Sequence, residues 1–158
     1  MTVYAAIAGL LALMGGFVFY ASLDNPSLQQ TKIELQSVEV INVNTVDNIT
    51  ELQISFLIKN PSEKTFTVPL INFKLFANGE QIGIGQYSTV DIPMAGRAAF
   101  YPDAEIPLKT TLSIARSDVK SDIYQAIIDE KNIEFSAEGI ITVETAWSLI
   151  EKEFQSSL

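Results

Sequence analysis

The chain has no cysteine and no histidine in its 158 residues. Without cysteine it forms no disulfide, has no thiolate nucleophile and lacks the ligands of the usual zinc sites. Without histidine it cannot carry a Ser-His-Asp triad or use an imidazole as an acid or base. Basic residues are also scarce, with 10 Lys and Arg against 19 Asp and Glu and a net charge of −9. Phosphate backbones bind to basic faces, so we expect no nucleic-acid partner.

The catalytic devices that remain are paired carboxylates, a Ser-Lys pair or a metal held by carboxylates. Asp103 and Glu105 are the nearest carboxylate pair with the same-face spacing of a strand, and we expect them to lie in a solvated loop. The sequence contains no EF-hand calcium loop. We therefore expect a protein that is not an enzyme and that uses neither a cofactor nor a metal.

The N-terminal segment Val3–Leu23 carries no charged side chain. A helix of about 20 residues rises about 30 Å, which matches the hydrocarbon core of a bilayer. A cleaved signal peptide is the alternative, but the first two residues supply no basic n-region, and Phe19 occupies the −3 position of a cut after Ala21. We therefore predict an uncleaved transmembrane anchor over residues 1–23, with the lipid bilayer as a partner.

Small residues make one side of this predicted helix narrow. They are Gly9, Ala12, Gly15 and Gly16. Small residues let membrane helices approach closely, so these four are candidate contacts with other membrane protein subunits or with a second copy of the chain. Gly and Ala are also common in membrane spans generally, and this alternative stays open.

The sequence gives little indication of the orientation of the anchor. The nearest cation is Lys32 on one side and the terminal amine on the other, so the excess of positive charge that marks the cytoplasmic side is missing. An N-terminal anchor followed by a long translocated domain is the common arrangement. We therefore expect a single-pass membrane protein whose soluble domain is extracytoplasmic. The one Asn-x-Thr sequon places a candidate glycosylation site at Asn48.

Residues 24–32 begin with a helix stop, Asp24-Asn25-Pro26-Ser27, and we expect them to form a linker. Residues 33–144 carry strand patterns separated by turn signals, which predicts one β domain. In its first strand, Ile33–Val43, the apolar alternation slips. The slip indicates a bulge or an edge position.

The clearest strand is Leu52–Ile58, where apolar and polar residues alternate. Asn60-Pro61 ends it, because proline cannot donate to a β-ladder. Asn78-Gly79 predicts a two-residue hairpin turn, because both residues tolerate a positive φ.

The period changes between Asp118 and Glu130, where apolar residues form one stripe of a helix. Residues 132–144 return to alternation and predict the last long strand, with a bulge at Gly139. Together these patterns predict a mainly β protein. Its core is a β-sandwich with one helix inserted before the last long strand, preceded by a single transmembrane α-helix.

Residues 145–158 form an amphipathic C-terminal tail in which Trp147, Ile150 and Phe154 recur at helical spacing. These side chains either pack on the domain or contact a partner subunit or the membrane surface. Whether the tail is a helix or a strand stays open.

Three segments, in this order and spacing, resemble the late embryogenesis abundant (LEA) group-two family, also called the water-stress and hypersensitive-response (WHy) domain. They are Asn60-Pro61 after an apolar strand, the hairpin Leu75–Gly85, and Ile92-Pro93-Met94-Ala95-Gly96 before the next strand. The resemblance covers residues 33–144. It implies an immunoglobulin- or fibronectin-like antiparallel sandwich and a non-enzymatic protein of desiccation or stress protection. The chain departs from the family pattern at the tail, where a last strand is expected.

The preferred hypothesis is a membrane-anchored interaction or accessory subunit of a membrane-associated assembly, which acts through the anchor and the tail. A stress-protective protein that shields membranes or client proteins is the alternative, and it follows from the resemblance. A pilin-like filament subunit is a lesser alternative, because pilins also join an apolar helix to a β domain. The residues before the apolar run are too few for a pilin leader.

Overall fold

The computed structural model of the protein describes residues 2–129 and 131–158. Met1, in the predicted anchor, and Glu130, at the end of the predicted inserted helix, lie outside the described residues. The helical elements are α1 (Thr2–Ser22), α2 (Asn25–Leu28), the 3-10 helix η1 (Met94–Gly96) and α3 (Ser121–Ile128). The strands are β1 (Lys32–Asn44), β2 (Ile49–Lys59), β3 (Phe66–Ala77), β4 (Glu80–Ser88), β5 (Ala99–Phe100), β6 (Glu105–Ala115), β7 (Phe135–Glu144) and β8 (Leu149–Ser157).

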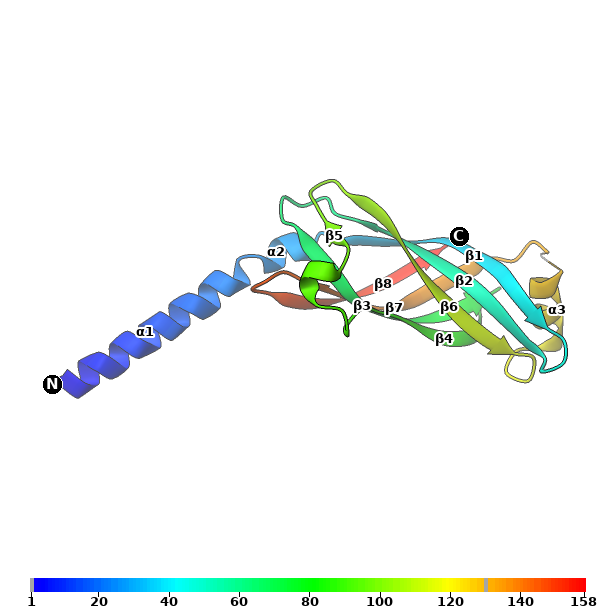
Figure 1. Ribbon diagram of the computed structural model, residues 1–158, viewed down its shortest axis with the longest axis horizontal. Helices are drawn as coiled ribbons and strands as arrows, with labels where there is room; N and C mark the ends of the chain where they lie inside the picture. Colours follow the sequence, from blue (N-terminus) through cyan, green and yellow to red (C-terminus); the bar gives the residue numbers. More distant parts are fainter. Residues whose placement is uncertain (1, 130) are drawn as a thin grey trace.

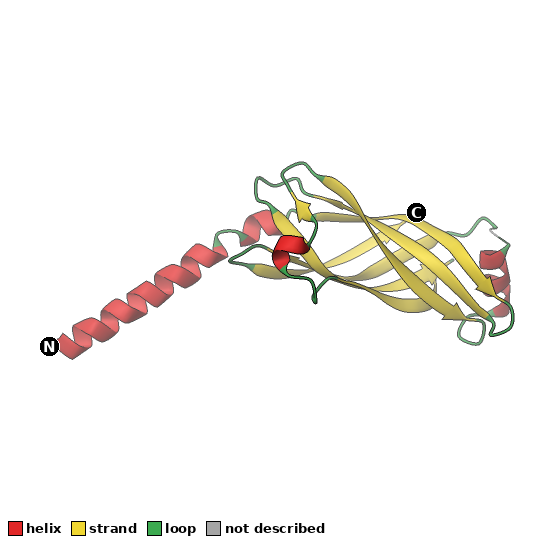
Figure 2. Ribbon diagram, viewed as in Figure 1, coloured by secondary structure: helices red, strands yellow, loops and turns green. Residues whose placement is uncertain are grey.

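Two antiparallel sheets face each other and form an elongated sandwich (Figures 1 and 2). One sheet has the order β1-β2-β6, and the other has the order β4-β3-β7-β8 with β5 paired to β3. The helix α1 projects from one end of the sandwich, and α3 lies at the opposite end (Figure 1). The predicted antiparallel β-sandwich with a helix before the final strands is confirmed.

Aromatic and branched side chains from both sheets fill the space between them. In β2, Leu52, Ile54, Phe56 and Ile58 are completely buried, as the alternation predicts. The Phe56 ring stands edge-on to Phe73 of the opposite sheet, with the ring centroids 5.0 Å apart. This layer is the core of the protein.

The first strand is both bulged and at an edge, so the slip in its alternation has both of the causes that were considered. β1 pairs with β2 alone, and its register shifts between Leu35 and Ser37 and again between Val40 and Asn42. Hydrogen bonds close two corners of the sandwich. The Leu35 amide donates to Ser156 Oγ at 2.9 Å, and the Thr110 hydroxyl donates to the Gln86 carbonyl at 2.8 Å.

The inserted helix is shorter than its apolar stripe suggests. α3 begins at Ser121, and Val119, which the stripe includes, is buried in the core just before the helix. Gly139 does not mark a bulge, because the β3–β7 register runs through it opposite Phe73 without a shift. The strands approach so closely there that a Cβ on Gly139 would lie 2.0 Å from the Asn72 carbonyl oxygen. Glycine is therefore required by close backbone packing.

The C-terminal tail is a strand. β8 pairs with β7 along its whole length, from Glu144↔Leu149 to Ser136↔Ser157. The sandwich thus extends past residue 144, where the sequence pattern placed the end of the domain. The strand is the last member of the β4-β3-β7-β8 sheet.

Candidate functional site

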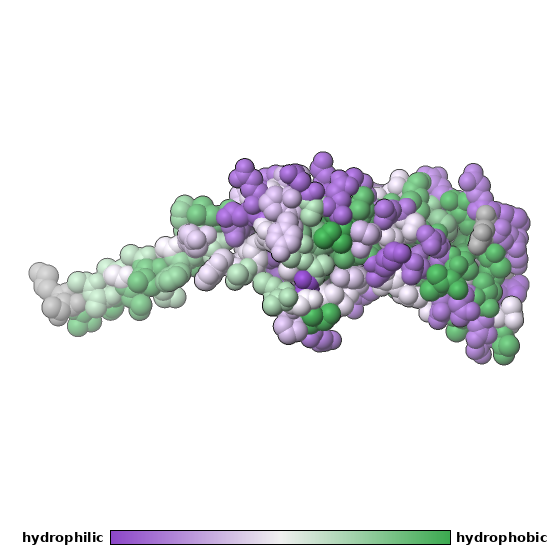
Figure 3. Space-filling model, turned by 45° about the horizontal axis from the view of Figure 1, so that its top comes forward, coloured by the Kyte–Doolittle hydropathy of each residue, from purple (hydrophilic) through white to green (hydrophobic). Residues whose placement is uncertain are grey.

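The helix α1 is a long apolar surface that the rest of the described chain leaves uncovered. Every residue from Val3 to Tyr20 is exposed. An 18-residue window within Val3–Leu28 has a mean hydropathy of 2.0, so by length and composition this helical segment is able to cross a membrane, although a signal sequence has the same properties. Figure 3 shows hydrophobic residues (green) over most of α1.

The four small residues predicted as partner contacts all lie on this bare helix. A Cβ added at Gly9, Gly15 or Gly16 would meet no atom of the described residues within 4 Å. Ala12 is exposed as well. Packing within the described part of the chain therefore does not require small residues at these positions.

The predicted linker is docked on the sandwich. Leu28 of α2 is completely buried in the core. The Asp24 carboxylate accepts a hydrogen bond from the Thr145 hydroxyl at 3.3 Å and pairs with Lys64 Nζ at 3.2 Å. Ser148 donates a hydrogen bond to Asn25. The chain is thus fixed to the sandwich within a few residues of the end of α1.

Lys152 completes this docking from β8. Its side chain points inward, and Nζ donates to the carbonyl oxygens of Gln29 at 2.9 Å and Thr31 at 2.6 Å. The final carbonyls of a helix have no partner within the helix, and a lysine is well suited to bind them. Lys152 therefore holds the segment between α2 and β1 against the last strand.

Arg97 organises the loop 89–98. Its Nε donates to the carbonyl oxygens of Thr89 at 3.0 Å and Ile92 at 2.7 Å, and a terminal nitrogen donates to Val90 at 3.2 Å. The guanidinium also forms an ion pair with Glu144 at the end of β7. The loop is thereby tied to the same end of the sandwich as the β7–β8 turn.

Two of the segments that resemble the LEA group-two family have structural roles. Asn60 is buried, and its amide nitrogen donates to the carbonyl oxygens of Lys64, Phe100 and Tyr101 at 2.8 to 3.0 Å, so it joins three chain segments. Asn78 and Gly79 both adopt a positive φ, of 51° and 81°, which confirms the predicted turn. These residues maintain the fold, and they form no group with reactive chemistry.

The three residues of the C-terminal tail that were predicted as partner contacts differ in burial. Ile150 is buried, and Phe154 packs edge-on against Phe56 with the ring centroids 5.7 Å apart. Both side chains therefore pack on the domain, which is one of the two alternatives considered for the tail. Trp147 lies in the β7–β8 turn and is 67% exposed.

The candidate sequon lies far from α1. Asn48 is exposed in the β1–β2 turn with a φ of 54°, at the end of the sandwich that carries α3. The hydroxyl of Thr50 in the same sequon is buried and donates to the Tyr124 hydroxyl at 2.9 Å.

The outer face of the β4-β3-β7-β8 sheet carries a shallow hollow. Its lining includes the ion pair of Lys74 and Glu138, at 3.2 Å, together with the exposed side chains of Ile84 and Ile140. Among the described residues, no group of three or more Asp and Glu side chains could hold a metal. The hollow offers contact area, and it gathers no catalytic set.

The groups with shifted pKa values are dispersed over the surface. A hydrogen bond with Glu34 raises the pKa of Lys59, and one with Glu80 raises the pKa of Lys120. Burial raises the pKa of the Tyr87 phenol. These groups lie on different elements, so they do not mark a common site.

No family model matches the chain, and no curated protein matches it. Solved structures do. The AT1g01470 protein from Arabidopsis thaliana is 13% identical, with a TM-score of 0.55 over 80% of this chain and 79% of that one. A protein from Archaeoglobus fulgidus is 17% identical, with a TM-score of 0.47 over 79% and 94%. At2g46140.1, a candidate LEA protein, is 12% identical, with a TM-score of 0.48 over 99% and 86%. The likeness to AT1g01470 shows a shared fold.

Proposed function

We propose that the chain is a membrane-anchored, non-enzymatic β-sandwich that acts as an interaction subunit beside other membrane proteins. One observation carries the proposal: α1 is apolar and is exposed from Val3 to Tyr20, although the sandwich has a core of its own. An apolar surface of this size needs a cover of lipid or protein. A bilayer covers a helix of this length along its whole apolar part.

The small residues of α1 support a neighbour within the membrane. Gly9, Ala12 and Gly16 follow one another at intervals of three and four residues, so they share one face of the helix. Such a face allows the backbone of a second helix to approach closely. The occupant in this proposal is a helix of another membrane subunit or of a second copy. The exposed position of Asn48 is compatible with an extracytoplasmic sandwich.

Extraction of the full chain from intact membranes tests the anchor. Retention in the membrane pellet at alkaline pH, and its loss when Leu11 at the centre of α1 is replaced by Arg, are expected. Ile84→Arg, on the exposed sheet face, serves as the control and keeps the chain in the pellet. Recovery of the wild-type chain in the soluble fraction would contradict the proposal.

Crosslinking and native sizing in mild detergent test the neighbour. We expect a complex larger than the monomer, which the double substitution Gly9→Leu/Gly16→Leu disrupts because it fills the small face. Val18→Phe, which adds bulk on the opposite side of α1, is the control. A monodisperse monomer with no crosslinked protein would exclude the interaction role and leave the anchor intact.

A stress-protective role is the second candidate. Its support is the resemblance of three ordered motifs to the LEA group-two family, together with the sandwich fold that carries them. A client enzyme dried or heated with vesicles that contain the full chain should retain more activity than with empty vesicles. Equal loss of activity in both samples at an equimolar ratio would reject this role.

A further inference from the structure

We propose that the sandwich makes a second membrane contact of its own: the end beside α1 rests on the headgroup region of a zwitterionic bilayer, with Trp147 as its principal anchor. This end, called the proximal end below, consists of α2, the loops 60–65, 89–98 and 101–104, and the turn 145–148. The inference rests on the proposed membrane anchor and adds to it a fixed position of the folded domain on the membrane surface, called the lipid seat below.

Large apolar side chains gather at the proximal end although the core is complete without them. Those that are exposed are Leu23, Val90, Ile92, Met94, Tyr101, Trp147 and Leu149. They come from four segments that are far apart in the sequence. Hydrogen bonds bring these segments together, since Thr145 binds Asp24, Glu144 binds Arg97, and Asn60 binds Tyr101. Leu23 of this set directly follows the end of α1 at Ser22.

The two loops that present the patch are held in place. The Arg97 guanidinium fixes the backbone at Val90 and Ile92, as described above. In the β7–β8 turn, Thr145 Oγ1 accepts hydrogen bonds from the backbone amides of Trp147 at 3.3 Å and Ser148 at 3.2 Å. An exposed apolar side chain on a fixed backbone loses little conformational entropy when a surface covers it.

The level of Trp147 along the chain suits a membrane interface. Its turn binds Asp24 and Asn25, which directly follow α1 and Leu23. Tyr20 is exposed in the last turn of α1, and Tyr4 is exposed in the first. The two tyrosines are about 24 Å apart along a helix, against about 30 Å for a hydrocarbon core, so in a centred helix each lies about 3 Å inside an interface. Trp and Tyr concentrate at both interfaces of a bilayer, so Trp147 joins the belt at the Tyr20 level.

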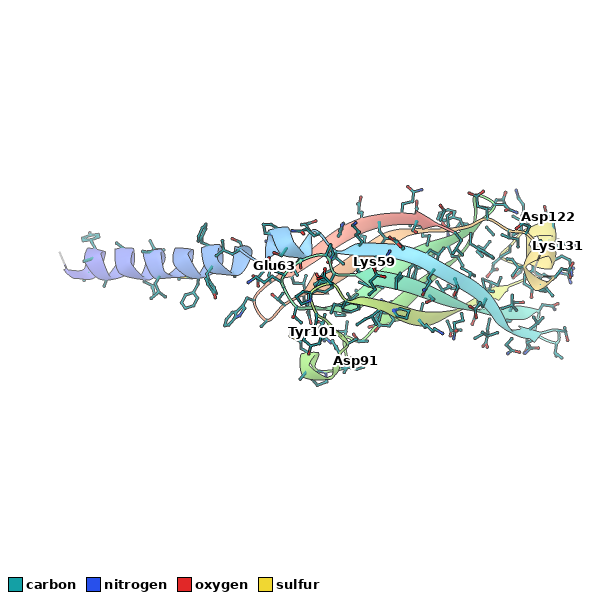
Figure 4. The ribbon with its side chains drawn as sticks, turned by 90° about the horizontal axis from the view of Figure 1, so that it is seen from above. Lys59, Glu63, Asp91, Tyr101, Asp122 and Lys131 are labelled. Carbon is teal, nitrogen blue, oxygen red and sulfur yellow. The ribbon has the colours of Figure 1, made fainter. Side chains whose placement is uncertain are left out.

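The charges of the proximal end select the kind of lipid. Glu63, Asp91 and Asp103 are exposed there, and Figure 4 shows Glu63 and Asp91 with Tyr101 at the end nearest α1. The two cations within these segments have carboxylate partners, since Lys64 pairs with Asp24 and Arg97 pairs with Glu144. Lys32 and Lys152 lie just beyond them, on β1 and β8. An anionic surface would be repelled. The contact therefore fits phosphatidylcholine, and anionic lipid should weaken it.

The chain contains a single tryptophan, so its fluorescence reports on this contact alone. The full chain is reconstituted into phosphatidylcholine vesicles, with and without bromine atoms on the acyl chains near the headgroup. We expect a blue-shifted emission, quenching by the brominated lipid and protection from acrylamide. Replacing part of the phosphatidylcholine with phosphatidylserine should reduce the quenching by bromine.

A control variant moves the reporter to the other end of the sandwich. Val46 is highly exposed in the β1–β2 turn, so Trp147→Phe/Val46→Trp should emit as in water and escape quenching by bromine. Flotation of the same vesicles shows independently whether α1 holds the protein in the membrane. If the vesicles carry the protein on flotation but Trp147 emits as in water and is not quenched, the lipid contact of Trp147 is wrong and the α1 anchor is still supported. A blue shift without bromine quenching identifies a protein contact and also overturns the lipid seat. Failure to float overturns both.

Discussion

Arg97 and Glu144 form an ion pair from which water is largely withdrawn, with side chains 11% and 15% exposed. The pair joins the loop 89–98 to the last residue of β7. Glu144 also accepts a hydrogen bond from the Thr67 hydroxyl at 3.4 Å, which links the pair to β3. The loop 89–98, β3 and β7 thus meet at one carboxylate.

Loss of either partner of this pair should destabilise the fold, because the other charge stays buried without compensation. We expect Arg97→Met to lower the free energy of unfolding by about 3 kcal/mol. Urea unfolding followed by circular dichroism measures it. Lys74→Met, which removes an ion pair about half exposed on both sides, is the control and should cost about 0.5 kcal/mol. Equal effects of the two substitutions would contradict the assigned role of Arg97.

Asn60→Asp tests the junction at the end of β2. The substitution keeps the shape but removes the amide donors that bind three carbonyl oxygens, and it places a carboxylate beside them. We expect a loss of about 3 kcal/mol or more in unfolding free energy. Asn72→Asp is the matched control, since Asn72 is exposed and accepts one hydrogen bond from Gln86. A thermal midpoint that stays at the wild-type value in the Asn60 variant would refute this role.

Gly139→Ala should prevent correct pairing of β3 with β7. The new Cβ would lie 2.0 Å from a backbone oxygen, which cannot turn aside as a side chain can. We expect a loss of more than about 3 kcal/mol, or a failure to fold. At Gly83 the obstacle is a flexible side chain, Leu112 Cδ2 at 2.9 Å, so Gly83→Ala should be milder. Soluble yield and thermal midpoint rank the two variants, and the reverse ranking would count against the close-approach explanation.

Alkaline pH should destabilise the protein partly through Tyr87. Burial raises the pKa of its phenol, so the folded state holds this proton more tightly than the unfolded chain. The contribution is fully present below about pH 10 and is lost as the pH rises through the folded pKa. Urea unfolding between neutral and strongly alkaline pH measures this limb. Tyr87→Phe should flatten it relative to wild type, and Tyr101→Phe, at an exposed position, should leave it unchanged.

The parts of the fold that local patterns determine were predictable. The alternation in β2 and the Asn78-Gly79 turn require only neighbouring residues, and both appear as expected. The β8 strand was ambiguous for a physical reason. Ile150 and Phe154 are four residues apart, a spacing that places two side chains on one face of a helix and also on one face of a strand.

The contacts that form the proximal end could not be predicted from local patterns. Lys152 meets the carbonyl oxygens of Gln29 and Thr31 across more than a hundred residues of sequence. Arg97 likewise finds Glu144 only after the sheet has assembled. Trp147 was identified as a surface candidate, but its level beside the end of α1 depends on how β7 and β8 pair.

The docking of α2 has a consequence for recognition. A domain joined to its membrane span by a loose tether must give up rotational freedom when it binds a neighbour, and this loss weakens binding. Here Leu28, Asp24 and Lys152 have already removed much of that freedom before any encounter. In the membrane-anchored form that we propose, the sandwich and its span therefore meet a neighbouring protein as one unit.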